Sequence, residues 1–124
     1  MPVEERYVRE TGIFPIMHTV ALRKELVDEN PWIAMNLLEA FEESKRRSIE
    51  RALFVGSCFP IPWGYELARR AQQIFGEDYW PYGIEANRTT LNAFLQYAFE
   101  QGVCHRRLQP EELFAPQVQR RARV

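Results

Sequence analysis

The segment Gly12–Arg23 constrains the fold of this chain more than any other segment, because it alone has the pattern of a β-strand. It has the sequence GIFPIMHTVALR, and its apolar residues stand on both faces, which is typical of strands in parallel sheets covered on both sides. Pro15 lacks a backbone N–H, so pairing is expected to begin at Ile16. The sequence therefore predicts one principal strand of an α/β fold.

This strand has no candidate partner elsewhere in the sequence. The backbone N–H and C=O groups of a strand need neighbours, and everything after Lys24 has the pattern of a helix or of a connection between helices. The chain itself is therefore expected to be mostly α-helical and to form a partial lobe of a larger fold. An exposed apolar strand is also a template for a second copy, which predicts a possible homodimer through this strand.

Turn and cap signals divide the rest of the chain. Asn30 precedes Pro31, which predicts a helix N-cap followed by a proline at the first helical position. Gly76 is expected to end a later helix, and Pro110 to begin a short turn. Residues 116–124 are expected to be a disordered tail. The apolar spacing predicts helices over residues 3–11, 23–29, 31–53, 65–75 and 84–101.

Composition excludes several classes of function. The 124 residues are 46% hydrophobic, within the range of one globular domain. Sixteen basic residues against seventeen acidic ones leave a net charge of −1, so binding to nucleic acid or to an anionic membrane is not expected. No apolar run reaches the length of a membrane span, and Met1–Glu5 lacks the pattern of a signal peptide. A cytoplasmic location is therefore expected.

The chain has few groups for metal binding or catalysis. Cys58 and Cys104 have no partners at metal-ligand spacing and are expected to be free thiols. No metal site and no cofactor are predicted. The basic run Lys45-Arg46-Arg47 follows Glu42-Glu43 at helical spacing. This spacing favours a solvated face with the i, i+4 ion pairs Glu42–Arg46 and Glu43–Arg47 over a nucleic-acid patch.

His18 and His105 are the only imidazoles available for acid or base chemistry. His18 stands alone among apolar neighbours on the predicted strand. It could be a core histidine bound to a backbone carbonyl, or a proton donor near the carboxyl end of a strand, where ligands collect in open α/β sheets. His105, in the run Cys104–Arg107, is expected to lie in a surface turn after a helix.

Three aromatic residues and one arginine are candidates for ligand binding. Trp63, Trp80 and Tyr82 lie in predicted loops, where their rings could form the wall of a pocket or could simply cover the edge of the sheet. Arg88 lies in the first turn of a predicted helix. A cation there opposes the helix dipole, so it could either be solvated or bind an anion.

Several long motifs resemble the carboxy-terminal part of the 4,5-dihydroxyphthalate decarboxylase family, and the resemblance runs almost from end to end. The motifs are GIFPIMHTV at 12–20, NPW at 30–32, FEESK at 41–45, WPYGIEANR at 80–88, CHRR at 104–107 and PEELF at 110–114.

The resemblance implies a fold similar to that of type II periplasmic binding proteins, with two lobes and a ligand cleft between them. Residues 1–124 would then be the carboxy-terminal fragment of such a domain, roughly its last third, and Gly12–Arg23 would supply one strand to a sheet of the first lobe. The implied reaction is the non-oxidative decarboxylation of a dihydroxylated aromatic diacid to protocatechuate and CO2.

Position and chemistry suggest a role for each candidate residue in such a reaction. His18 would be the general acid that protonates the ring carbon. Trp80 and Tyr82, with Trp63, would hold the aromatic ring, and Arg88 would bind a carboxylate.

Two other functions remain open, because proteins of the implied fold also bind solutes without chemistry. The parent protein could be a binding protein for a small aromatic or pyrimidine-like ligand, or this chain could be an inactive truncated product. In either case the fragment alone is expected to be inactive as a decarboxylase.

Overall fold

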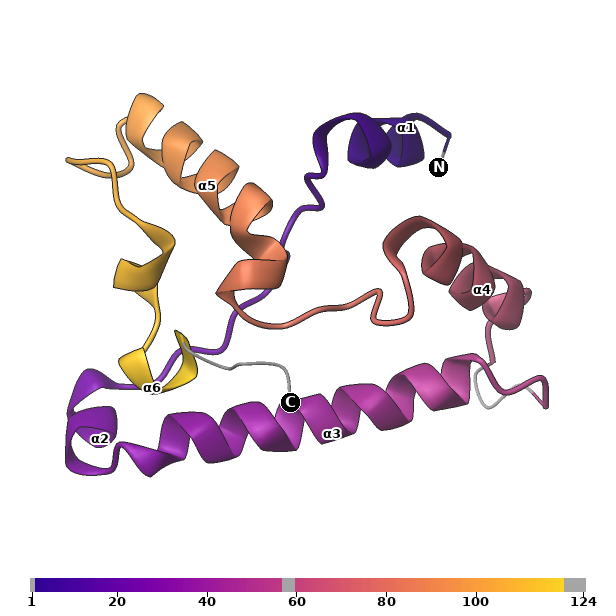
Figure 1. Cartoon of the computed structure of the whole chain (residues 1–124), viewed down its shortest axis with the longest axis horizontal. Coiled ribbons are helices and arrows are strands. Elements are labelled where there is room, and N and C mark those ends of the chain that lie inside the picture. Colours follow the sequence, from indigo (N-terminus) through magenta and orange to yellow (C-terminus); the bar gives the residue numbers. More distant parts are fainter. Residues whose placement is uncertain (1, 57–59, 120–124) are drawn as a thin grey trace. The chain divides into compact units, whose positions relative to one another are not determined.

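The computed structural model describes residues 2–56 and 60–119, and the regular structure in these residues is helical (Figure 1). None of the described helices is both long enough and apolar enough to cross a bilayer. The elements in chain order are α1 Pro2–Thr11, α2 Lys24–Glu29, α3 Trp32–Ala52, α4 Gly64–Phe75, α5 Ile84–Glu100, the 3-10 helix η1 Pro110–Leu113 and α6 Pro116–Gln119.

The predicted helices are confirmed to within a few residues at each end. Proline begins α1, η1 and α6, because its fixed φ suits a first turn that needs no N–H donor there. Gly76 follows α4 with φ +91°, a conformation that favours glycine. Residues 116–119 form α6, so the expected disordered tail does not begin at residue 116, and residues 120–124 lie outside the described part of the chain.

The predicted strand is wrong for this chain, since residues 12–23 have no regular secondary structure. The start of the segment is held by side chains: the Ile13 N–H donates to Thr11 Oγ1 at 3.1 Å, and the Phe14 N–H donates to Thr90 Oγ1 on α5 at 3.2 Å. In the described part of the chain, backbone hydrogen bonds join no other segment to residues 15–22. A strand needs a neighbour to form a ladder, and the chain supplies none. The α/β parent fold stays a prediction.

Asn30 also differs from the prediction. Its side-chain Nδ2 donates to the Leu26 carbonyl at 3.4 Å, so it closes the end of α2. The start of α3 is bound by the backbone instead, with the Ile33 N–H donating to the Asn30 carbonyl at 3.0 Å. The dipeptide Asn30-Pro31 does separate two helices as predicted, but the amide group caps the preceding helix.

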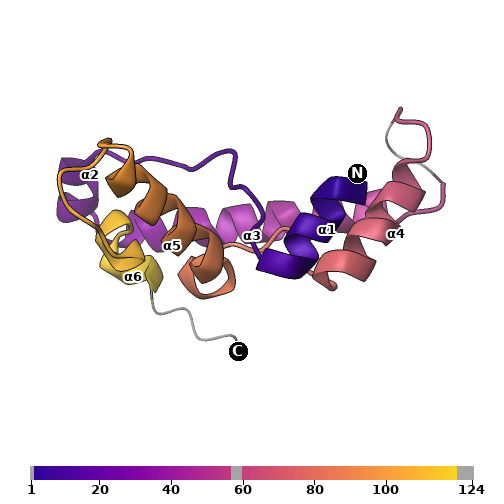
Figure 2. The ribbon, with the colours of Figure 1, turned by 90° about the horizontal axis from the view of Figure 1, so that it is seen from above.

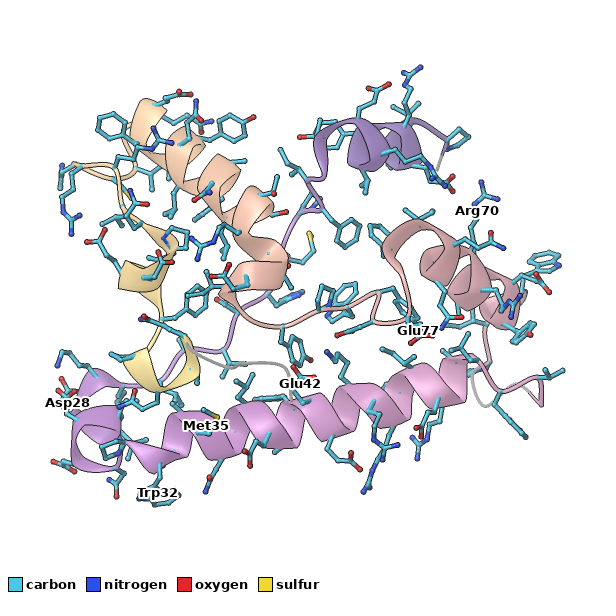
Figure 3. The ribbon with its side chains drawn as sticks, viewed as in Figure 1. Asp28, Trp32, Met35, Glu42, Arg70 and Glu77 are labelled. Atoms are coloured by element: carbon cyan, nitrogen blue, oxygen red, sulfur yellow. The ribbon has the colours of Figure 1, made fainter. Side chains whose placement is uncertain are left out.

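The chain divides into two compact units, which we describe separately. The first contains residues 1–36 and 82–124, and the second contains residues 37–81. In the first unit the core lies along one face of α5, where Ile84, Leu91, Leu95 and Ala98 are buried. At the start of α3, Ala34 is buried, whereas Trp32 and Met35 point to different sides of the helix (Figure 3).

The end of the first unit folds back on itself. Gln119 Nε2 on α6 donates to the carbonyls of Glu111 at 2.7 Å and Phe114 at 2.6 Å. Both views show α6 close to the turn that precedes it (Figures 1 and 2). Pro110, at the start of η1, is fully buried. A few side chains therefore fix a segment that has little regular structure of its own.

The second unit contains most of α3 and all of α4, and it corrects one prediction about charge. The Lys45 side chain is only 8% exposed and pairs with Glu42 and with Asp78, so Lys45 does not belong to a solvated face. Arg46 and Arg47 do remain exposed. Arg47 pairs with Glu43 at 2.7 Å as predicted, whereas Arg46 pairs with Glu43 and Glu50 rather than with Glu42.

Replacing Leu95 by alanine tests the position of the core. Leu95 is 3% exposed, so the truncation should lower the free energy of unfolding by about 2–4 kcal/mol through lost burial and a residual cavity. The neighbouring Phe94 is 59% exposed, and Phe94→Ala should cost less than about 1 kcal/mol. Urea denaturation followed by circular dichroism measures both, and equal losses would contradict this assignment of the buried face.

The pairing of two copies through residues 15–22 remains a prediction. Met17 and Val20 are 71% and 65% exposed, and the backbone around them could pair with a second chain. The chain should therefore elute as a dimer in size-exclusion chromatography with light scattering at micromolar concentration. Val20→Pro removes an N–H from the pairing edge and should give a monomer. A wild-type chain that is monomeric at every concentration tested would refute the prediction.

Candidate functional site

Gly83 fixes where α5 begins and hence where its first side chains lie. Its backbone has φ +91° and ψ 167°, a region that is essentially open to glycine alone. A Cβ atom at this position would meet nothing within 4 Å, so the requirement is conformational and not steric. The Asn87 side chain donates to the Gly83 carbonyl at 2.9 Å. The motif Gly83-Ile84-Glu85-Ala86-Asn87-Arg88 thus builds a defined helix entry.

Arg88 lies one turn into α5 and is held by two carboxylates. Its Nη2 donates to Glu111 Oε1 at 2.6 Å and to Glu85, and its Nε donates to Glu85 Oε2 at 3.2 Å. These hydrogen bonds raise the pKa of Arg88 and lower the pKa of Glu85 and of Glu111. Glu85 also places a negative charge in the first turn of α5, where it interacts favourably with the positive end of the helix dipole. The contact with Glu111 ties α5 to η1.

The Arg88 cluster, defined as Arg88, Glu85 and Glu111, could exchange a protein carboxylate for a ligand carboxylate. The Arg88 side chain is 37% exposed, so a ligand in solvent can reach it. A guanidinium binds carboxylates through paired N–H donors. However, the cluster already carries two carboxylates for one cation, so an anion would have to displace Glu111 or Glu85 and not simply add to them.

His18 lies in the irregular segment and is exposed. The segment begins at Gly12, which has φ +67° and passes close to α5, since a Cβ at this residue would lie 3.8 Å from Thr89 Cγ2. Two residues later, the backbone N–H of Phe14 donates to Thr90 Oγ1 on the same helix. These contacts bring residues 12–14 to the helix that carries Arg88, but they end four residues before His18. His18 is therefore not a buried core histidine in this chain, and both of its predicted roles in the parent fold stay predictions.

The candidate aromatic residues are divided between the two units. Tyr82 is partly buried in the first unit, directly before α5, whereas Trp63 and Trp80 belong to the second unit. Trp63 is 80% exposed and has φ 59°, an uncommon conformation for a bulky residue. Trp80 is 48% exposed, and its backbone N–H donates to Asp78 Oδ1 at 3.3 Å. His18, Tyr82 and Arg88 share one unit.

Sequence reasoning missed the roles of the two carboxylates in η1, Glu111 and Glu112. Glu112 accepts hydrogen bonds from the Gln109 N–H at 2.7 Å and from Arg106 Nη2 at 2.6 Å, and Gln109 and Glu112 form a capping box. The sequence did contain a signal for the bond between Gln109 and Glu112. The two residues stand at the spacing of a capping box, with Pro110 at the first position of the turn. No local pattern could have shown that Glu111 meets Arg88, which lies 23 residues away along the chain.

The remaining candidates lie outside the Arg88 cluster. His105 is exposed, and Cys104 is a free thiol of intermediate burial, whereas Cys58 lies outside the described residues. No group of three or more metal-ligating side chains gathers in residues 2–56 and 60–119. A shallow hollow of about 290 Å³ lies along Arg47, Glu50, Arg51 and Phe54, and none of the predicted site residues lines it.

Comparison with known proteins identifies the relationship. Over 105 residues the chain is 37% identical to a 4,5-dihydroxyphthalate decarboxylase of Comamonas testosteroni, and the match covers 84% of this chain. The chain is related to the 4,5-dihydroxyphthalate decarboxylase family. The resemblance seen in the motifs is thereby confirmed. The chain spans about a third of the length of this decarboxylase, because the match covers 32% of it, and no family model matches the chain.

Protonation of Glu112 at acidic pH should break the hydrogen bonds that its carboxylate accepts at η1. Hydrogen bonds from Arg106 and from the Gln109 N–H lower the pKa of Glu112 below its ordinary value of 4.5. A carboxylate with a lowered pKa contributes stability above that ordinary value, and the contribution is lost as the pH falls through the lowered pKa. The Gln109 amide resonance in an NMR titration should therefore shift with a midpoint below pH 4.5.

Arg106→Gln provides the control for this titration. It removes the Arg106 hydrogen bond, the larger cause of the lowered pKa of Glu112, but leaves the Gln109 N–H in place, so the midpoint should move up toward the ordinary range. A wild-type midpoint at or above pH 4.5, or one that Arg106→Gln does not move, would contradict the ion pair.

Proposed function

We propose that this chain supplies part of a carboxy-lyase that removes one carboxylate from a dihydroxylated aromatic diacid and yields protocatechuate and CO2. The supporting observation is the 37% identity to a 4,5-dihydroxyphthalate decarboxylase over 84% of the chain. The chain would belong to a two-lobed parent fold of the type II periplasmic-binding-protein kind. The remaining part of that fold would complete the ligand cleft.

The reaction sets the groups that a site must provide. The bond between the ring carbon and the leaving carboxylate breaks, its electron pair stays on the ring carbon, and CO2 departs. A proton then bonds to that carbon, so no oxidant or reductant takes part. The site must therefore hold the second carboxylate, orient the ring, stabilise the charge that develops on it and deliver one proton.

Arg88 suits the role of holding the carboxylate that is retained. Its guanidinium is partly exposed and is bound by Glu111, which belongs to a different element. A substrate carboxylate that replaced Glu111 would restore a charge-assisted pair of the same kind, so the cation would not be left without a partner. Glu111 would then hold Arg88 in place when no substrate is bound.

His18 is proposed as the general acid, and Trp63, Trp80 and Tyr82 as the residues that hold the ring. An imidazole can donate a proton near neutral pH, and aromatic side chains offer flat apolar faces to a ring. In this chain His18 lies in an irregular segment. The other part of the parent fold would have to order this segment, for which a neighbouring strand is the simplest means.

Binding without turnover by the parent protein is the alternative, and the exposed position of His18 argues against catalysis by the isolated chain. A general acid must lie within hydrogen-bonding reach of the carbon or group that it protonates, and in the described part of the chain the hydrogen bonds from this segment to α5 end at Phe14, four residues before His18. The isolated chain is therefore expected to release no CO2. A protein that only binds would show a raised melting temperature with the diacid but no product.

A chimera tests the proposed function. In it, this chain replaces the matching third of the Comamonas testosteroni decarboxylase, and CO2 release from 4,5-dihydroxyphthalate is measured. The chimera should be active, and His18→Gln should lower kcat by about 100-fold or more while KM changes little, because proton delivery is lost and binding is kept.

His105→Gln is the matched control in the same chimera, since His105 is exposed and has no proposed role. It should leave kcat within about two-fold. If His18→Gln also retained kcat within a few-fold, the general-acid role would fail. Ligand-induced stabilisation of the chimera without CO2 release would support a binding protein instead.

A further inference from the structure

Lys45 is an enclosed cation that joins two segments far apart in the sequence. Its side chain is 8% exposed, and its Nζ lies 2.8 Å from Glu42 Oε2 on the same helix and 2.8 Å from Asp78 Oδ2. Asp78 lies 33 residues further along the chain. Both partners belong to the second compact unit. In Figure 3, Glu42 lies on the side of α3 that faces the loop carrying Glu77.

Asp78 connects this cation to the aromatic loop, which we define as residues 77–81. One carboxylate oxygen, Oδ2, accepts a hydrogen bond from Lys45 at 2.8 Å. The other, Oδ1, accepts the N–H of Trp80 at 3.3 Å. A continuous path of hydrogen bonds therefore runs from α3 through one side chain to the backbone of Trp80.

The charge on Lys45 is kept by its partners. Burial by itself would lower the pKa of Lys45, but the hydrogen bonds with Asp78 and Glu42 outweigh it, so that its pKa is raised. The ammonium group therefore remains charged well above neutral pH. The ammonium group is the enclosed member of the pair, since Asp78 is 39% exposed, so removing Asp78 would leave the charge of Lys45 poorly compensated. The contact thus holds the loop firmly and does not release it near neutral pH.

We propose that Lys45 is a positioning residue that fixes the backbone of Trp80, through Asp78, for contact with an aromatic ligand. The part that concerns the ligand rests on the proposed function, since it takes Trp80 as a residue that holds the ring. The positioning of the loop itself stands on the geometry alone. Lys45 touches no substrate in this scheme and acts through the loop.

The order of the loop can be measured without any ligand. The chain has three tryptophans, so Trp32→Phe and Trp63→Phe leave Trp80 as the single fluorophore. In this background Lys45→Met should raise the acrylamide quenching constant of Trp80 about two-fold and lower its fluorescence anisotropy, while circular dichroism keeps its helical signal.

Two further variants separate the path of hydrogen bonds from a general loss of charge. Arg46→Met removes the neighbouring cation, which is 56% exposed, and should leave the quenching of Trp80 unchanged. Asp78→Ala should match Lys45→Met, and the double variant should add nothing further, because both single changes break the same path. Additive effects, or equal effects of Lys45→Met and Arg46→Met, would overturn the proposal.

A measurement on the wild-type chain needs no variant and decides the case if Lys45→Met fails to fold. The Trp80 amide should exchange with deuterium at least about ten-fold more slowly than an unprotected peptide amide, because its N–H is bound to a fixed carboxylate. Exchange of this amide at the unprotected rate would overturn the proposal.

The effect of Lys45 on substrate binding is measured in the chimera described under the proposed function. Lys45→Met should raise KM for 4,5-dihydroxyphthalate about ten-fold with a smaller change in kcat, because a loose loop weakens binding of the ring. If the loop loosens but KM is unchanged, Trp80 does not hold the ring, and that part of the proposed function fails while the positioning by Lys45 stands. If the loop does not loosen, the positioning fails and the proposed function is untouched.

Discussion

The unpaired backbone of residues 15–22 is the constraint on which the rest of this structure depends. Helices satisfy their own N–H and C=O groups, whereas a strand depends on a neighbour. The described residues offer no second strand, so all of their regular structure is helical. Among the described residues, the hydrogen bonds that tie the segment to α5 lie at its start, where the Phe14 N–H donates to Thr90. Its later residues leave exposed apolar side chains that a neighbouring chain segment would cover.

Charged side chains make several of the contacts between segments that are remote in sequence. The buried apolar side chains are few and gather mainly on α5. Lys45 joins α3 to the loop at Asp78, and Arg88 joins α5 to η1 at Glu111. The two contacts differ in kind. The Lys45 side chain is 8% exposed, so losing its partner would leave an enclosed charge, although Asp78 itself is 39% exposed. In the Arg88 pair both side chains are partly exposed, at 37% and 43%, so water can compete for the cation as well. The exposed pair is therefore the one that a ligand could exchange.

The motifs that resemble the decarboxylase family supply three of the four residues in these two contacts, and Asp78 lies just before one of them. Lys45 closes the motif at residues 41–45, Arg88 closes the motif at 80–88, and Glu111 lies in the motif at 110–114. Their residues therefore have structural roles whether or not they touch a substrate. A shared fold does not fix the reaction, and the proposed chemistry depends on His18, whose surroundings in the parent fold would come from sequence beyond this chain. Family and reaction are accordingly separate conclusions.

The sequence by itself determined the helices, and the tertiary structure decided which side chains meet. Apolar spacing, prolines at first turns and glycines after helices are local signals, and they placed the helices to within a few residues. The same local reasoning failed for several features, among them the strand at Gly12–Arg23, the Asn30 cap and the exposure of Lys45. Each of these depends on what lies beside the residue in space. A strand needs a partner, an amide can bind either of two neighbouring helices, and a lysine is buried only where a distant carboxylate such as Asp78 comes within reach.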